Sequence, residues 1–334
     1  MRVATLTMSL RAQNTVLNLQ NQFSRAQEQV STGKISQIYS GLRGDEARVS
    51  IQLREEIQTK EAYVSTIEQV RTRTKIMEAA LTGIQDLAEQ MRVELINQQE
   101  GKFDDTAPVL KQFADSAIDQ LVSLLNTQSE GRYLFNGTDV SNQPVDDAAT
   151  LKTAAFAAIP ALAVGNSAAV IAASATNFGT DANWNNVAGL IPGQTKPFAF
   201  DAAEGVRLEF GELANDNATF EELFEVLATF ADVDFAAGLD NDYRALVDDG
   251  LTRVEAAADE IGLMIASVGT TQARMTDIES QHKDDNTLLS NQLDGVENVD
   301  PYEAAAEFQL LQGQLQAAYQ TTASLRQLSL ANYI

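Results

Sequence analysis

The sequence contains no cysteine and only one histidine. Without cysteine the chain can have no disulfide framework, thiol nucleophile or thiolate-bound zinc. The one histidine, His282, lies on the apolar stripe of a predicted helix, where a packed side chain is commoner than a catalytic base. A histidine-centred metal site or a Ser-His-Asp triad would need partners that the sequence does not offer. We therefore expect no enzyme, and no catalytic, metal-binding or cofactor-binding residues.

Long apolar runs are also missing. No stretch approaches the roughly 18 consecutive apolar residues of a membrane-spanning helix, so we expect no membrane insertion. The opening residues lack the continuous apolar region and small-residue cleavage site of a secretory signal. We expect a protein that is either cytoplasmic or exported by a route that needs no such signal.

Positive charge is scarce. The chain has 23 lysines and arginines against 47 aspartates and glutamates, which gives a net charge of −24. Residues 1–100 hold 12 of each sign, so the whole excess lies in residues 101–334. Because such a surface repels phosphate backbones and anionic lipids, we expect binding to neither nucleic acid nor membranes.

Each end of the chain carries one thin apolar stripe at helical spacing, flanked mainly by uncharged polar residues. Asp300 and Pro301 form a helix start, with an N-cap and a first-turn proline. Because neither stripe could stabilise a lone helix, we predict that the two ends pack on each other and that their flanks face other subunits. The predicted assembly residues are Val3, Leu6, Leu10, Val16, Phe23, Val30, Phe308, Leu311, Leu315, Leu325, Leu328, Leu330 and Tyr333.

The elements between the two ends are ordered almost as a palindrome. Long helical patterns occupy residues 45–100 and 242–293, and a shorter one starts at Thr106, with Pro108 in its first turn. Residues 132–140 predict a strand, an Asn-Gly turn and a return strand. The order predicts that the first helix pairs with the last and the second with the second-last. The fold class is therefore mainly α: an elongated antiparallel bundle of long helices.

Residues 141–211 interrupt this pattern. Alanine, glycine, asparagine and threonine dominate the segment, and the helical spacing disappears. Residues 206–210, VRLEF, alternate like a strand. We predict three domains: a terminal domain of 1–44 plus 300–334, a helical domain with a hairpin of 45–140 plus 212–299, and a small β-rich or irregular insert of 141–211.

Five segments resemble the flagellin superfamily of bacterial flagella. They are LQNQFSRAQEQVSTGK at 19–34, ALTGIQDLAEQMRVELIN at 80–97, EGRYLFNGTD at 130–139, VGTTQAR at 268–274 and QTTASLRQLSLANYI at 320–334. The resemblance implies that the three predicted domains correspond to the D0, D1 and D2 domains of that superfamily. Within it, the opening MRVATLTMSL and the closing SLANYI are most similar to the hook-associated proteins of the hook–filament junction.

This resemblance implies a structural adaptor, with no cofactor, that joins hook to filament outside the cell. The implied partners are copies of itself in a ring or tubular lattice, a hook-side junction protein, filament flagellin and an export chaperone. The implied route is the flagellar type III apparatus. Two alternatives stay open. One is a self-polymerising filament flagellin. The other is a surface protein whose insert binds carbohydrate or a host ligand through Phe156, Phe178, Trp184, Phe198 and Phe200.

Overall fold

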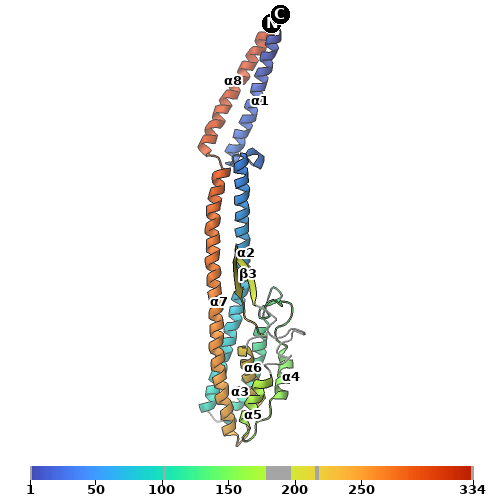
Figure 1. Ribbon diagram of the computed structural model, residues 1–334, viewed down its shortest axis with the longest axis vertical. Helices are drawn as coiled ribbons and strands as arrows, with labels where there is room; N and C mark the ends of the chain where they lie inside the picture. Colours follow the sequence, from blue (N-terminus) through green and yellow to red (C-terminus); the bar gives the residue numbers. More distant parts are fainter. Residues whose placement is uncertain (1, 101–102, 178–196, 215–217, 332–334) are drawn as a thin grey trace. The chain divides into compact units, whose positions relative to one another are not determined.

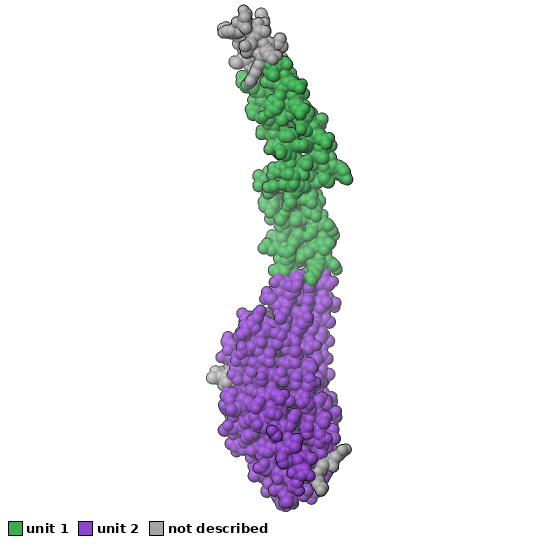
Figure 2. Space-filling model, turned by 180° about the vertical axis from the view of Figure 1, so that it is seen from behind, with its two compact units in different colours: residues 1–62, 282–334 green, residues 63–281 purple. Residues whose placement is uncertain are grey.

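The described chain forms two compact units. The computed structural model describes all residues except 1, 101–102, 178–196, 215–217 and 332–334, and only the backbone of 2–9, 100, 175–177 and 325–331. One unit, unit 1, comprises residues 1–62 and 282–334, and the other, unit 2, comprises residues 63–281 (Figure 2). Helices dominate both units, which confirms the predicted fold class. The predicted three-domain division stays a prediction.

The two terminal helices pair within unit 1. Helix α1 (Arg2–Thr32) runs antiparallel to α8 (Pro301–Ala331), and the two lie side by side (Figure 1). The Phe23 ring stacks on Phe308 at a centroid distance of 4.9 Å, and small side chains such as Ala26 and Ala304 are buried nearby. The Asp300 carboxylate accepts hydrogen bonds from the amides of Tyr302 and Glu303. The predicted pairing of the two ends and the predicted N-cap are both confirmed.

Unit 1 also contains one end of each long helix, α2 (Gly44–Glu100) and α7 (Asp240–Glu297). The Lys60 ammonium meets the Asp285 carboxylate at 2.7 Å between these two helices. A loop of residues 33–43, with a short 3₁₀ turn at Tyr39–Gly41, connects α1 to α2. Gly41 is required in this loop, because a Cβ there would lie 2.1 Å from the Ser36 hydroxyl oxygen. The loop is therefore tightly folded rather than an open linker.

Unit 2 holds the main core. The remainder of α2 and α7 packs with α3 (Phe103–Leu125) and α6 (Ala218–Asp232). The Gln272 amide donates to the Glu78 carboxylate at 2.8 Å, which ties α7 to α2. The largest fully buried side chains of this core are Met77, Leu81, Ile84, Met91, Leu95, Phe135, Phe220, Phe224 and Tyr243. The second predicted helix thus pairs with the second-last, as expected.

The predicted strand–turn–strand at 132–140 is right in its turn but not in its strands. The Asp139 amide donates to the Asn136 carbonyl at 3.1 Å and the Tyr133 amide to the Val140 carbonyl at 3.0 Å, so the chain turns back at Asn136-Gly137, but the assigned hairpin precedes this turn. The hairpin joins β1 (Gln128–Ser129) to β2 (Arg132–Tyr133), and its turn is Glu130-Gly131. Both turn residues have positive φ, at 54° and 74°, which is the requirement of a type I′ turn. Asn136 instead donates through its side-chain amide to the carbonyl of Asn142 and is fully buried. The Asn-Gly pair therefore forms the predicted turn, which the Asn136 side chain supports, while the assigned strands form a shorter hairpin before it.

The predicted start of the third helix is also wrong. Helix α3 begins at Phe103, so Pro108 lies inside it rather than in its first turn. The Thr106 hydroxyl donates to the side-chain oxygen of Gln98 at 2.7 Å. This hydroxyl is therefore used for a contact with α2.

The expected β-rich or irregular insert contains two helices besides a hairpin. They are α4 (Ala148–Ala158) and α5 (Ser167–Asn177). Alanine has the highest helix propensity, but these segments have too few large apolar residues to show a stripe. Strands β3 (Phe198–Ala203) and β4 (Val206–Phe210) form the hairpin, which confirms the predicted strand at 206–210. This hairpin packs on α2 and α7 through a small separate cluster that includes Ile67, Leu208 and Met275.

The surroundings of two glycines in α7 predict that substitution by alanine changes the free energy of unfolding in opposite directions. A Cβ at Gly250 would lie 2.7 Å from the buried Phe230 ring, whereas a Cβ at Gly269 would have nothing within 4 Å. We expect Gly250→Ala to lower the free energy of unfolding by about 1–2 kcal/mol, because overpacking outweighs the gain in helix propensity. We expect Gly269→Ala to raise it by up to about 1 kcal/mol. Urea unfolding followed by circular dichroism measures both, and effects of the same sign would contradict this packing.

Candidate assembly site at the terminal helices

The two chain segments that lead into and out of the terminal helices are hydrogen-bonded to each other. The Ile35 amide donates to the carbonyl of Glu297 at 2.7 Å, and the Val299 amide donates to the carbonyl of Gly33 at 2.9 Å. Lys34 and Asn298 lie between them as an antiparallel β-bridge. Only residues 298–300 separate α7 from α8. The bridge therefore holds the start of α8 and the end of α1 together.

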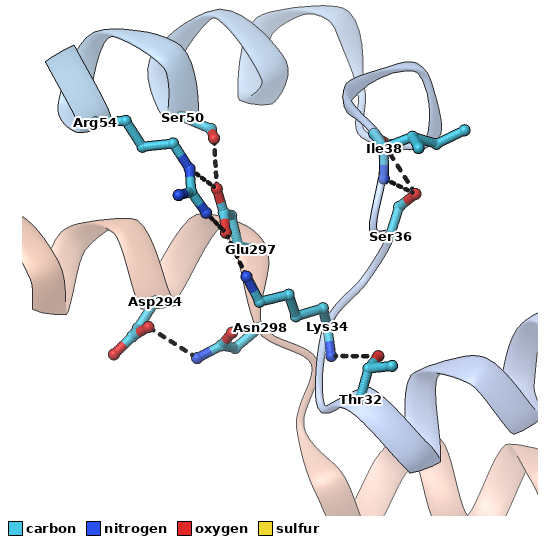
Figure 3. Close-up of polar contacts among 9 residues, drawn as sticks. All are labelled: Thr32, Lys34, Ser36, Ile38, Ser50, Arg54, Asp294, Glu297 and Asn298. Carbon is cyan, nitrogen blue, oxygen red and sulfur yellow. Dashed lines mark hydrogen bonds and ion pairs between the residues drawn. The ribbon is translucent and has the colours of Figure 1, made fainter.

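One buried carboxylate, that of Glu297, reinforces this bridge (Figure 3). The Arg54 guanidinium binds it with two hydrogen bonds, Nε to Oε1 at 2.8 Å and Nη2 to Oε2 at 2.6 Å. The Ser50 hydroxyl donates to Oε1 at 2.6 Å, and the Lys34 ammonium donates to Oε2 at 3.2 Å. We call these four residues the Glu297 clamp. It connects the end of α7 to the first turns of α2 and to the loop after α1.

The electrostatics of the Glu297 clamp favour the ionised carboxylate. The Arg54 hydrogen bond, with further bonds from Ser50 and Lys34, lowers the pKa of Glu297 to about 2, although burial opposes this. The same hydrogen bond raises the pKa of Arg54. Bidentate pairing of a guanidinium with a carboxylate is among the stronger polar contacts in proteins. The clamp is therefore a charged contact that stays intact well into the acid range.

The paired terminal helices leave several large apolar side chains uncovered. Leu10, Leu17 and Leu310 are 51%, 55% and 61% exposed. A groove of about 630 Å³ runs between the helices, lined on one side by Val16 and Leu17 and on the other by Tyr319, Thr322 and Ala323. Apolar side chains left exposed beside such a groove make this surface a candidate for contact with another molecule. The pair on its own buries only part of its stripe.

The predicted assembly residues fall into three groups. Those that lie at least partly buried in unit 1 are Val16, Phe23, Phe308, Leu311 and Leu315. Those that are exposed are Leu10 and Val30. Those whose side chains are outside the described part are Val3, Leu6, Leu325, Leu328, Leu330 and Tyr333. Their common role in contacts between subunits stays a prediction.

Sequence reasoning missed the Glu297 clamp. Lys34 was named only as the last residue of the segment at 19–34, and Glu297 lies between the predicted helix at 242–293 and the helix that starts at Asp300 and Pro301. The one signal was the palindromic order of the helices. It predicts that the two long helices pair antiparallel, so that Glu297, near the end of one, lies close to Arg54, near the start of the other. Their meeting depends on the register of the two helices, which that order leaves open.

The described aromatic residues proposed as a ligand platform are used in packing. Phe198 stacks on Phe210 at 5.3 Å, and Phe200 meets the same ring edge-on at 6.0 Å. Phe156 packs against the main core of unit 2. Phe178 and Trp184 lie outside the described residues. The described rings therefore contribute to two apolar clusters rather than to an aromatic surface.

The described residues show neither a metal site nor a membrane-spanning helix. They contain no group of three or more histidine, aspartate or glutamate side chains that could hold a metal ion. In the same part of the chain, no helix combines the length and the apolar character needed to cross a membrane.

Comparisons with known proteins point to one family. The model of the bacterial flagellin N-terminal helical region matches residues 3–140, and that of the bacterial flagellin C-terminal helical region matches residues 251–334. A search of curated proteins found no match. A solved structure assigned as a flagellar hook-associated protein from Vibrio parahaemolyticus is similar with a TM-score of 0.54 at 14% identity, over 75% of this chain and 96% of that one. FlgL from Bacillus cereus has a TM-score of 0.45 at 15% identity, over 70% and 99%. At this identity the first of these shows a shared fold.

The Glu297 clamp predicts a specific dependence on pH. Because the pKa of Glu297 is lower in the folded than in the unfolded chain, its stabilisation is complete above the ordinary pKa near 4.5 and is lost as the pH falls towards 2. We expect Glu297→Gln to lower the free energy of opening at the bridge by about 2 kcal/mol at pH 7, and by less than half as much at pH 3. Hydrogen exchange of the Ile35 and Val299 amides measures this opening.

The matched control is Glu307→Gln, which removes a carboxylate from an exposed position on α8. Surface changes of this kind stay within about 0.5 kcal/mol, and we expect no effect on these two amides. A loss in Glu297→Gln that is equal at pH 7 and pH 3 would contradict an ionic clamp.

Proposed function

We propose that this chain, which belongs to the flagellin superfamily of flagellar structural proteins, is the adaptor that joins the hook of a bacterial flagellum to its filament. The two flagellin family models cover more than half of its 334 residues, one at each end. An adaptor of this kind needs surfaces that pack against several neighbours at once. The terminal helices are where we place those surfaces.

The observation that carries this proposal is the uncovered, nearly uncharged surface of the paired terminal helices. Helix α1 contains three arginines and one glutamate, and α8 contains two glutamates and one arginine. Exposed leucines such as Leu17 and Leu310 lie among glutamine, threonine and serine. Depletion of charge around exposed apolar side chains is the composition of an interface core between proteins. Neighbouring subunits would complete the burial that α1 and α8 leave unfinished.

The sequence at the two chain ends supports the function of a junction adaptor over that of a filament flagellin. The opening MRVATLTMSL and the closing SLANYI are more similar to hook-associated proteins than to filament flagellins. The proposed partners are therefore copies of the same chain in a ring, a hook-side junction protein on one side and filament flagellin on the other. Export through the flagellar type III apparatus with a chaperone, and the absence of enzymatic activity, belong to the same proposal. A self-polymerising filament flagellin is the competing function.

The position of the chain on the flagellum separates these two functions. Antibodies against the chain, applied to isolated flagella with their hooks, report that position by gold labelling in the electron microscope. If the chain is the junction adaptor, the gold label forms a single band where the hook meets the filament. Label along the whole filament would overturn the junction and support a filament flagellin.

An exposed leucine of the terminal pair tests the assembly surface itself. Because Leu17 is 55% exposed in the isolated chain, we expect Leu17→Asp to leave its melting temperature unchanged. In the assembled flagellum the new carboxylate would be buried without a partner, which costs several kcal/mol and should abolish incorporation. Cell fractionation and immunoblotting of sheared flagella measure incorporation.

The matched control is Val164→Asp, the same kind of change at an apolar residue of unit 2 that is 81% exposed. We expect this variant to incorporate normally. Normal incorporation of Leu17→Asp would contradict the proposed use of the terminal pair as a subunit contact.

A further inference from the structure

The joint between the terminal pair, α1 and α8, and the ends of the two long helices has almost no apolar core. Two short chain segments make this joint, the loop that connects α1 to α2 and the three residues that connect α7 to α8. Across residues 31–43 and 291–303, the only buried side chains are those of Leu42 and Glu297. The joint therefore depends on polar contacts.

Each side of the joint has contacts of its own. In the terminal pair, the Phe23 ring stacks on Phe308. Between α2 and α7 in unit 1, Leu53 is buried, and the Lys60 ammonium donates to the Asp285 carboxylate at 2.7 Å. Neither set of contacts involves the residues of the joint. Both helix pairs should therefore remain intact if the joint opens.

The backbone provides one hinge point in each connection. Gly33 ends α1 with a φ of 71°, a conformation that glycine adopts without steric cost. Residues 298–300 are not helical and separate α7 from α8. Hinges in proteins are a few loop or helix-end residues that absorb a change in φ and ψ. Gly33 and residues 298–300 are therefore the places about which the terminal pair would turn.

The Glu297 clamp restrains both hinge points at once (Figure 3). Glu297 is the last residue before one hinge point, and Lys34 is the first residue after the other. The Lys34 ammonium donates to the Glu297 carboxylate at 3.2 Å. Arg54 and Ser50 of α2 bind the same carboxylate at 2.6–2.8 Å. One carboxylate thus fixes the chain next to both hinge points to α2.

Removal of this one carboxylate releases all three partners. The side chains of Arg54 and Lys34 are 44% and 41% exposed, whereas that of Glu297 is 8% exposed. Water therefore reaches both cations when the carboxylate is lost, and neither becomes a buried unpaired charge. The backbone hydrogen bonds from Ile35 and Val299 then remain. A variant at Glu297 should therefore release the joint without unfolding the chain.

We propose that the Glu297 clamp is a lock that holds the terminal pair in one orientation on the ends of α2 and α7, and that neighbouring subunits bind the pair in this orientation. Without the carboxylate, α1 and α8 stay paired and turn together about the two hinge points. A surface held in its bound orientation loses less entropy on association. The role in subunit binding rests on the proposed assembly of the chain in the flagellum, whereas the lock itself does not.

The absence of cysteine allows spin labels to be attached at introduced thiols. One labelled pair, Gln58→Cys with Gln314→Cys, spans the joint from α2 to α8. A second, Asn18→Cys with Gln314→Cys, lies within the terminal pair, and all three positions are exposed. Double electron–electron resonance on the full-length free chain measures the distance between the labels. We expect one narrow distance distribution for each labelled pair.

We expect Glu297→Gln to abolish the narrow distribution across the joint and to leave the one within the terminal pair unchanged. Arg54→Met removes the main contact from the side of α2 and should have the same effect, whereas the matched control Glu307→Gln should have none. Narrow distributions across the joint in both clamp variants would overturn the lock. Broad distributions in both labelled pairs would overturn the hinge, because the terminal pair would then have come apart.

Incorporation into flagella tests the role of the lock in subunit binding. In competition with the natural chain, we expect Glu297→Gln to be incorporated about tenfold less, as when about a tenth of the molecules hold the binding orientation. Incorporation equal to that of Glu307→Gln would overturn this role and leave the junction function standing. Gold label along the whole filament would instead refute the junction function, and the lock measured on the free chain would stand.

Discussion

The terminal helices α1 and α8 depend on each other, because neither has enough apolar surface to be stable alone. Each carries a thin stripe, and the stripes meet at the stacked rings of Phe23 and Phe308. The partners lie almost 300 residues apart in sequence, so the chain between them must bring them together. Helix α2 follows α1 in the chain and α7 precedes α8. The backbone bridge between Lys34 and Asn298 joins these two connections to each other. The same thin stripe leaves leucines uncovered, and these give the pair its proposed function in assembly.

Much of this fold could be predicted from the sequence, because long amphipathic helices show a regular spacing of apolar residues. The stripes of α1 and α8, the long patterns of α2 and α7, and the cap at Asp300 all appear as predicted. The alternation of residues 206–210 likewise predicts β4. The resemblance at both ends names the family that the comparisons then show. These are features in which local pattern and tertiary packing agree.

The features that could not be predicted depend on contacts between distant residues or on weak patterns. The Glu297 clamp requires the register of α2 against α7, which spacing leaves open. The hairpin turn at Glu130-Gly131 has no Asn-Gly or Asp-Gly pair to mark it, whereas the turn that does form at Asn136-Gly137 joins no assigned strands. Helices α4 and α5 are rich in alanine, pack on the main core through a few side chains such as Leu151 and Val170, and have no stripe of large side chains that spacing could reveal. The predicted helix start at Thr106 is wrong because α3 begins at Phe103, and the Thr106 hydroxyl donates to the side chain of Gln98.

We propose that the terminal pair completes its burial only when neighbouring subunits cover it. Hydrogen exchange of the free chain and of isolated flagella measures this most directly, residue by residue, in α1 and α8. We expect fast exchange at residues 10–32 and 301–324 in the free chain and strong protection in the flagellum, with the parts of α2 and α7 in unit 2 protected in both. Equal protection of the terminal helices in the two states would contradict it.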